Sequence, residues 1–341
     1  MKTSDPTGNS LREMAQTLIG APITEFEPIR GGRNSRLYRI RSRDSTFALK
    51  LYPTQQDNLH DRLTTEVDAL RLMKRHQFGA VPGVVAVDRD HGFVLLSWIE
   101  GEPLTTVSAS DIDQAVAFLA AIYTLQQTPT FGKHRHAAEA CLAAIEIEQQ
   151  ISARLKRLKE LPAEEESLHA FLENSFGPAF DRLVGKIRVR MRTVGLDYSA
   201  ALPQEKRCLV PSDFGFHNSL RRSDGSLAFF DFEYFGWDDP VKLTADVLLH
   251  PGMQMSPAQR QRFRCAAEHL YGVDATFRAR LDALYPLFAL RWALIVLNEF
   301  LPDRWRHRVT TGAAERWTVA KQRQLALAHG YVANVAAEKH Q

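Results

Sequence analysis

The chain has 341 residues, 45% of them hydrophobic, which is enough for a sizeable core in one large domain or two smaller ones. Its 43 basic and 40 acidic residues nearly cancel, so the composition favours neither nucleic acid nor a membrane as the main partner. Three widely separated cysteines argue against a disulfide framework or a structural zinc site. Together with an N-terminus that lacks an apolar secretion signal, they predict a cytoplasmic protein.

The first hundred residues have the pattern of short strands. The segment SRLYRIRSRDSTFALKLY predicts two strands around a polar turn at 41–45. In the second of these strands Lys50 alternates with apolar residues and shares its face with Ala48 and Tyr52. A helix is predicted at 58–75, because apolar residues recur there every three to four positions, and strand character then returns.

After Gly101 the sequence becomes mainly helical. The expected elements are helices at 111–126, 137–161 and 164–194, the last interrupted at Gly177–Pro178, a strand region with a hairpin turn at 208–232, and helices from 257 onward. The order of these elements predicts an α+β protein. It has a small sheet-rich lobe at 1–100, a larger helical lobe at 101–341 and a hinge at 97–104.

The most apolar long stretch, 284–297, contains Arg291 and is too short to span a bilayer, so no membrane partner is predicted.

Two polar motifs lie in the 208–232 region. LVPSDFGFHN places Asp213 and Asn218 five positions apart, and Asp231 follows the apolar run at 227–230. Carboxylate and amide oxygens are ligands that Mg²⁺ accepts beside phosphate oxygens, so Asn218 and Asp231 are candidate metal ligands. Taken singly, Asp213 would be better explained as an acidic turn residue, and Asp231 could be an Asp in the turn that ends a strand.

Three further features lie in the predicted N-terminal lobe. Gly31–Gly32, just before a strand, would let the backbone approach a phosphate, although two such glycines alone most often form a turn. Lys50, inside an apolar strand, needs a partner or a ligand unless the strand lies at an edge and Lys50 reaches solvent. Glu66, in the following helix, could hold Lys50 in an ion pair or could simply be solvated.

The order of these features is typical of kinase-type phosphoryl transfer. At these residues the sequence resembles the aminoglycoside phosphotransferases and choline kinases, which are small-molecule relatives of protein kinases. GGRNSRLYRI is similar to the nucleotide loop of that group, and DFEYFG is similar to its metal-binding segment. The resemblance covers residues 20–250 and implies a bilobal protein-kinase-like fold.

The resemblance also implies a role for each motif. Asp213 would orient the acceptor hydroxyl and take its proton, while Asn218 and Asp231 would hold Mg²⁺. ATP would be bound by the glycine loop, by Lys50 with Glu66 as its partner, and by the backbone of SWIEG. The nucleotide-binding residues that it implies are Gly31, Gly32, Asn34, Ala48, Lys50, Glu66, Trp98 and Ile99.

Two positions depart from the pattern of this group. Its members usually have a His two residues before the catalytic Asp, and this chain has Pro211 there, which affects the support of the loop and not the reacting groups. Asp246 would brace the catalytic loop from near the start of a helix, although it follows Pro240 at a longer interval than is usual.

Three further carboxylates follow the metal-binding segment. Glu233, Asp238 and Asp239 would line the mouth of the cleft, where they would either bind an amine-bearing substrate or cap turns.

The leading hypothesis is ATP- and Mg²⁺-dependent transfer of phosphate to a hydroxyl of a small molecule. An aminoglycoside-resistance kinase needs an acidic pocket, and the chain is not acidic overall, so a sugar or related metabolite is the favoured acceptor. A nucleotide-binding pseudokinase with a regulatory role is the alternative from another class. Pro211 favours that alternative, whereas the intact Asp213, Asn218 and Asp231 count against it. A protein kinase is disfavoured, because no APE motif follows DFE.

Overall fold

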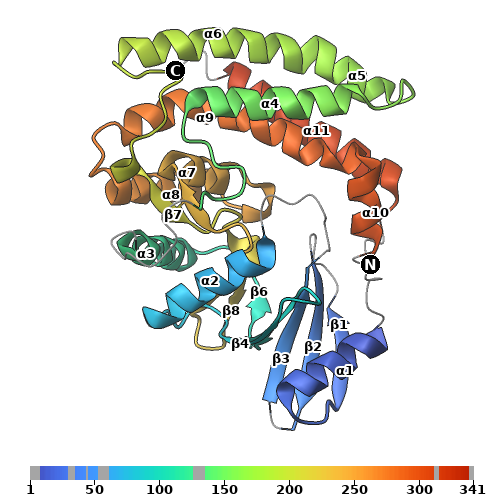
Figure 1. Ribbon diagram of the computed structural model, residues 1–341. Coiled ribbons are helices and arrows are strands. Elements are labelled where there is room, and N and C mark those ends of the chain that lie inside the picture. The colour runs from blue at the N-terminus through green and yellow to red at the C-terminus, as the bar shows by residue number, and fades with distance from the viewer. Residues whose placement is uncertain are drawn as a thin grey trace.

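The computed structural model describes residues 8–29, 35–43, 45–52, 61–125, 135–310 and 315–337. An antiparallel sheet at the N-terminal end is followed by a mainly helical region, and the two lie at opposite ends of the molecule (Figure 1). The predicted α+β class is therefore confirmed. The lobe boundary at residue 100 stays a prediction; the last strand of this sheet ends at Ser97.

Five strands form the N-terminal sheet in the order β1-β2-β3-β5-β4, and every neighbouring pair is antiparallel. Their bounds are β1 Glu25–Ile29, β2 Arg36–Ser42, β3 Ser45–Leu51, β4 Val84–Asp88 and β5 Phe93–Ser97. The predicted hairpin is β2–β3, and its turn is tighter than expected because Ser42 still pairs with Ser45. Strand β3 lies in the middle of the sheet, which removes the edge-strand interpretation of Lys50.

The two faces of β3 belong to different cores. Leu49 and Leu51 pack with Leu11 and Ala15 of α1 (Gly8–Ile19), a helix that the sequence analysis did not predict. Tyr52 and Ala48 pack into the large core that continues toward the helical region. The alternation predicted for β3 is confirmed, and it places Lys50 on the face opposite α1.

Helix α2 (Arg62–Arg75) also packs against the sheet, through β4 and β5. The described helix begins at Arg62, because Asp61 caps it by accepting a hydrogen bond from the Thr64 N–H at 2.9 Å. The predicted start at residue 58 is thus too early, and residues 58–60 lie outside the described part of the chain.

A set of short strands and helices lies between the sheet and the outer helices. Its members are β6 Glu102–Pro103, α3 Ala109–Leu125, η2 Gln204–Lys206, β7 Cys208–Val210, η3 Phe216–Asn218, β8 Ser219–Arg221, β9 Leu227–Phe229, β10 Gly236–Asp238, α7 Pro240–Leu249 and η4 Pro251–Met253. Strands β8 and β9 form the predicted hairpin, and β6 extends it on the other side. Strand β7 pairs instead with β10.

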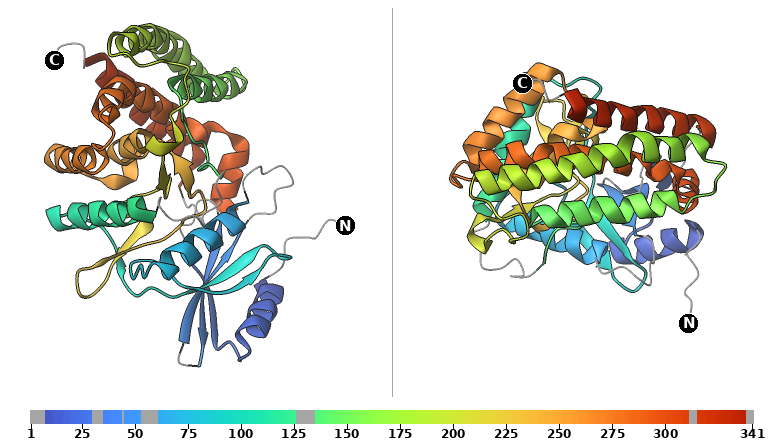
Figure 2. Two further views of the ribbon diagram at one scale, coloured as in Figure 1. Left: turned by 60° about the vertical axis from the view of Figure 1, so that its left-hand side comes forward. Right: turned by 90° about the horizontal axis from the view of Figure 1, so that it is seen from above.

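The remaining helices cover the end of the molecule away from the sheet (Figures 1 and 2). They are α4 Ala144–Lys159, α5 Glu166–Phe171, η1 Leu172–Phe176, α6 Gly177–Thr193, α8 Pro257–Tyr271, α9 Phe277–Val296, η5 Leu297–Phe300, α10 Pro302–Thr310 and α11 Trp317–Ala337. Helix α9 runs through the middle of this group and contacts α4, α6, α7 and α11.

Two predicted helices differ from the observed ones. The helix expected at 137–161 begins only at Ala144, because 137–143 forms turns in which the Cys141 N–H donates to the Asp238 carboxylate. The interruption expected at Gly177–Pro178 is a single π-helical turn between α5 and α6. The Gly177 N–H donates to Leu172 O there, and the wider turn accommodates the proline ring without ending the helix.

One helical stretch, Phe277–Phe300, is long and apolar enough to cross a membrane by length and composition. Most of it, 72% of its most apolar window, is buried inside the protein, as expected for the core helix of a globular fold.

The fold predicts which cysteine reacts with thiol reagents. Burial raises the pKa of Cys141 to about 12 and also raises that of Cys208, so neither forms the nucleophilic thiolate, whereas Cys265 is exposed. Iodoacetamide applied to the native protein should modify Cys265 alone, and peptide mass spectrometry should find all three modified after unfolding. Rapid native labelling of Cys208 would contradict this packing.

Candidate active site

The ammonium group of Lys50 lies at the centre of a cluster of carboxylates. Its Nζ is 2.6 Å from Glu66 Oε2, 2.5 Å from Asp231 Oδ1 and 3.2 Å from Glu233 Oε2. Glu66 comes from α2, whereas Asp231 and Glu233 follow β9, so the three contacts join the sheet to the segment after the hairpin. The ion pair predicted between Lys50 and Glu66 is present, and Glu66 is buried, which removes its interpretation as a solvated residue.

Further hydrogen bonds hold Glu66 in place. The Tyr52 hydroxyl donates to Oε2, and the Phe232 N–H donates to Oε1 at 3.4 Å. Both carboxylate oxygens of Glu66 are therefore engaged, one toward the sheet and the other toward the segment after β9. Glu66 thus fixes the position of Lys50 relative to that segment.

Glu233 is completely buried, although the sequence analysis expected it to line the mouth of a cleft. Its Oε2 accepts a hydrogen bond from the Ser35 hydroxyl at 3.1 Å, and Arg62 approaches its Oε1 at 3.6 Å. Ser35 directly precedes β2, so this contact places the start of that strand beside Lys50. The sequence signal for Glu233 was its position two residues after Asp231.

The charges in this cluster do not balance. Three carboxylates face Lys50 and Arg62. Burial alone would lower the pKa of Lys50, but Asp231 and Glu66 outweigh it and raise that pKa well above its usual value. Burial, reinforced by Glu233 and Glu66 and opposed by Lys50, raises the pKa of Asp231 to about 7. Such a surplus of carboxylate favours binding of an additional cation.

The β8–β9 hairpin explains the spacing of the predicted metal ligands. Ser219 pairs with Phe229, and the Phe230 N–H donates to Asn218 O at 3.1 Å, so Asn218 and Asp231 lie at the same open end of the hairpin. Asp231 has a φ of 70°, an unusual left-handed conformation for a residue other than glycine. This conformation ends the strand and turns the carboxylate to Lys50, as is often seen at functional sites.

The loop after β7 carries Asp213. Ser212, directly before Asp213, has a φ of 67° and so has the same unusual positive φ as Asp231. The Asn218 side-chain amide donates to Asp213 O at 2.9 Å, which leaves its oxygen as the group that it can offer to a cation. Direct contacts therefore join Asp213 to Asn218 and Asp231 to Lys50, and the Phe230–Asn218 hydrogen bond brings the two pairs to the same end of the hairpin.

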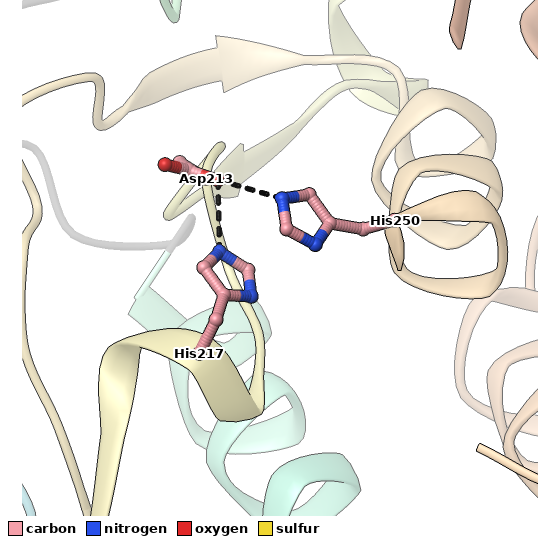
Figure 3. Close-up of side chains that lie close together, drawn as sticks. All are labelled: Asp213, His217 and His250. Atoms are coloured by element: carbon pink, nitrogen blue, oxygen red, sulfur yellow. Dashed lines mark hydrogen bonds and ion pairs between the residues drawn. The ribbon is translucent and has the colours of Figure 1, made fainter. Parts of the chain in front are cut away.

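Two histidines that the sequence analysis did not select lie beside Asp213 (Figure 3). His217 Nε2 is 3.0 Å from Asp213 Oδ1, and His250 Nε2 is 4.0 Å from the same oxygen. The only signal for His217 was its place within LVPSDFGFHN. His250 ends α7 and comes close only through the tertiary fold, so no local pattern could have identified it.

Gly215 is required by the close packing of this loop. A Cβ atom built there would lie 2.3 Å from Met253 Sδ and 2.8 Å from the His217 ring. The absence of a side chain allows the loop to lie against both groups.

Asp246 lies in the second half of α7, not near its start as predicted. The helix begins earlier because Asp239 caps it and Pro240 occupies its first turn. Asp246 Oδ1 accepts a hydrogen bond from Trp292 Nε1 at 2.7 Å, and the edge of the Trp292 ring system meets the His250 ring with centroids 4.8 Å apart. Asp246 therefore reaches the catalytic loop through Trp292 and His250.

Asp238 and Asp239 do not line a cleft mouth either. Asp238 is buried and pairs with Lys242 at 3.2 Å, and Asp239 pairs with Arg280 in addition to capping α7. Asp239 does have a capping role, but it caps a helix and not a turn as the alternative expectation had it.

The remaining predicted nucleotide-binding residues have mixed outcomes. Gly31, Gly32 and Asn34 lie outside the described residues. Ala48 pairs with Leu96 in the sheet on the same face as Lys50, and Trp98 and Ile99 directly follow β5, half-buried. Their role in nucleotide binding stays a prediction.

The ion-pair cluster makes the stability of the protein sensitive to Lys50. In Lys50→Met, the buried Glu66 and Glu233 lose their main cation, so the free energy of unfolding should fall by about 3 kcal/mol or more. Urea denaturation measures the change. Arg157→Met, which breaks an exposed pair with Asp303, is the matched control and should cause a much smaller loss. Equal losses would show that the Lys50 cluster contributes no more than a surface pair.

Comparison with known proteins places this geometry in a family. A search of curated proteins finds no match. Three solved structures have similar folds. A spectinomycin phosphotransferase with ADP and spectinomycin has a TM-score of 0.62 and 14% sequence identity, and the match covers 96% of this chain and 99% of that one. A choline kinase from Streptococcus pneumoniae has a TM-score of 0.56 and 15% identity, with 95% and 98% covered, and an aminoglycoside phosphotransferase has a TM-score of 0.60 and 12% identity, with 98% and 100% covered. The model of the phosphotransferase enzyme family matches residues 25–270, most of the chain. The protein therefore belongs to the phosphotransferase enzyme family.

Proposed function

We propose that the protein transfers the γ-phosphate of ATP, with Mg²⁺, to a hydroxyl group of a small molecule. The observation that carries this proposal is the chain of contacts from Lys50 to Asp231 and, through the end of the β8–β9 hairpin, from Asn218 to Asp213. A cation, a carboxylate, an amide oxygen and a second carboxylate are the groups that phosphoryl transfer requires, since positioning and charge neutralisation provide most of the catalysis.

Each of these residues has a distinct task in the proposed reaction. Lys50, held by Glu66, binds phosphate oxygens through its ammonium group. Asp213 accepts a hydrogen bond from the acceptor hydroxyl, aligns its oxygen with the γ-phosphorus and takes its proton. Asn218 and Asp231 hold Mg²⁺, which offsets negative charge on the phosphates when it is bound. The surplus carboxylates around Lys50 fit this ion, because hard oxygen ligands are the ones that it prefers.

The charges near the catalytic loop bear on the acceptor. Asp246 pairs with Lys242 and Arg291, and Glu139 pairs with Arg154 and Arg291. The carboxylates of this charge network, of which Asp246 is mostly buried and Glu139 is exposed, are therefore matched by cations and do not form the acidic surface that a polycation needs. This balance supports a sugar or related neutral metabolite as acceptor over an aminoglycoside.

A regulatory pseudokinase is the competing function. Pro211 is the feature that favours it. The intact Asp213, together with Asn218 and Asp231 at one end of the same hairpin, favours catalysis instead.

Screening for the acceptor tests the proposal. ADP release should be measured with a panel of sugars, amino alcohols and aminoglycosides, and a sugar-like compound should stimulate it. Asp213→Asn should lower kcat about 100-fold or more while leaving ATP binding unchanged, because this substitution removes the proton acceptor and keeps the shape. ATP binding with no transfer or hydrolysis under any condition would favour the pseudokinase.

The metal requirement gives a separate prediction. Chelation of Mg²⁺ should abolish turnover, and excess Mg²⁺ should restore it. In Asp231→Asn, calorimetric titration should show that Mg²⁺ no longer strengthens ATP binding, because one of the proposed ligands has lost its charge. Full Mg²⁺-dependent binding by this variant would remove Asp231 from the proposed metal site.

A further inference from the structure

The two imidazoles beside Asp213 form a stacked pair. The rings of His217 and His250 lie with their centroids 3.8 Å apart and their planes at 10°, and both present Nε2 to Oδ1 of Asp213. Figure 3 shows that the other carboxylate oxygen of Asp213 points away from both rings. The side chains of His217 and His250 are 21% and 11% exposed, so the pair is largely shielded from water; His217 lies within hydrogen-bonding distance of Asp213, whereas His250 is farther away, at 4.0 Å.

The hydrogen bonds of His250 determine where its proton lies. The Gly252 N–H donates to His250 Nδ1 at 2.9 Å, so a neutral ring carries its proton on Nε2 and directs it toward Asp213. Since a carboxylate oxygen only accepts, Nε2 of His217 is also a donor. Both rings therefore direct an N–H to the same oxygen.

These three side chains could also be considered as ligands for a metal ion, because their donor atoms all lie within 4.8 Å of one another. Two observations argue against that use. A metal on Nε2 of His250 would require the proton to move to Nδ1, where the Gly252 N–H already donates. The nearly parallel rings also direct their Nε2 atoms side by side, whereas two imidazole ligands must converge on one ion in the plane of each ring.

The pair is itself supported from behind. The Trp292 and His250 rings meet almost at right angles, and Asp246 fixes the Trp292 ring by accepting a hydrogen bond from its N–H. Asp246 is held in turn by Lys242 at 3.2 Å, a buried residue whose pKa is raised by Asp238 and Asp246 against the effect of burial. The orientation of His250 therefore depends on a charged layer in α7 and α9.

This arrangement explains how the loop tolerates Pro211. Proline has no N–H and no polar side chain, and Pro211 is buried directly after β7, so it has no donor for a hydrogen bond to the Asp213 carboxylate. Resting on the function proposed above, we propose that His217 and His250 act together as positioning residues for Asp213. They hold one carboxylate oxygen so that the other faces the acceptor hydroxyl. The support that a His before the Asp would give comes here from two residues that follow the Asp, one in the same loop and one at the end of α7.

Kinetics of single variants test this inference, with slow ATP hydrolysis as the readout where the acceptor is unidentified. His217→Ala and His250→Ala should each lower kcat about tenfold or more, while KM for MgATP changes less than twofold. His217→Gln, whose amide nitrogen reproduces the Nε2–H donor, should recover a substantial part of the loss. The matched control is His91→Ala, which breaks a similar His–Asp contact with Asp88 in an exposed turn and should leave kcat unchanged.

A double-mutant cycle separates positioning from general support of the fold. In an Asp213→Asn background, His250→Ala should have almost no further effect on kcat, because the group through which it acts is already altered. Additive losses, or an equal rise in the KM for MgATP, would overturn the inference. Circular dichroism melting identifies any variant that fails to fold. If His250→Ala does not fold, Trp292→Phe is the milder change, because it keeps an aromatic ring beside His250 but loses the N–H bonded to Asp246, and it should lower kcat in the same way.

A spectroscopic measurement keeps this inference distinct from the proposed function. In ¹⁵N spectra of the histidine side chains, Asp213→Asn should shift the ring resonances of His217 and His250 and leave that of His91 in place. Unshifted resonances would contradict the contact itself. If the wild-type protein shows no turnover but the shifts are present, the proposed function is overturned, and with it the positioning role of the pair in catalysis. The contact of the two histidines with Asp213 would then be confirmed as a structural feature only.

Discussion

The site depends on one constraint, the placement of a single ammonium group among three carboxylates. Lys50 can lie there because β3 is central in the sheet and its opposite face is fixed by Leu49 and Leu51 against α1. The carboxylates come from α2 and from the segment after β9, so the same ion pairs that orient Lys50 also hold the sheet against that segment. Buried carboxylates without such a partner would be strongly unfavourable.

The Lys50–Asp231 pair also has a place in the proposed function. Lys50 pairs directly with Asp231, the residue proposed to hold Mg²⁺. In the proposed function the phosphates and the metal ion would arrive together. Lys50 would then exchange the Asp231 carboxylate for phosphate oxygens, and Asp231 would exchange the Lys50 ammonium for the metal ion. Positive φ values at Ser212 and Asp231 hold both carboxylates at the hairpin end in advance, which is the kind of strain that preorganised sites carry.

Much of this could be predicted from the sequence. The alternation in β3, the hairpin between Asn218 and Asp231 and the order of the motifs indicated the sheet, the helical region and the Lys50–Glu66 pair. The sequence could not show that Glu233 is buried, because a carboxylate near a strand end is usually exposed and only Lys50, Arg62 and Ser35 make its burial possible. It could not identify His250 either, because this residue meets Asp213 only through the packing of α7 against the catalytic loop. Asp246 was placed too early in its helix, since Asp239 was not recognised as the cap.

The central claim is that Lys50, Asp213, Asn218 and Asp231 surround one binding site for a triphosphate and its metal ion. A crystal structure with Mg²⁺ and a non-hydrolysable ATP analogue tests it most directly. The account predicts phosphate oxygens at Lys50, the ion bound by Asn218 and Asp231, and Asp213 facing the terminal phosphate. A nucleotide bound elsewhere, or phosphates at this site with Lys50 still paired to Asp231, would contradict it.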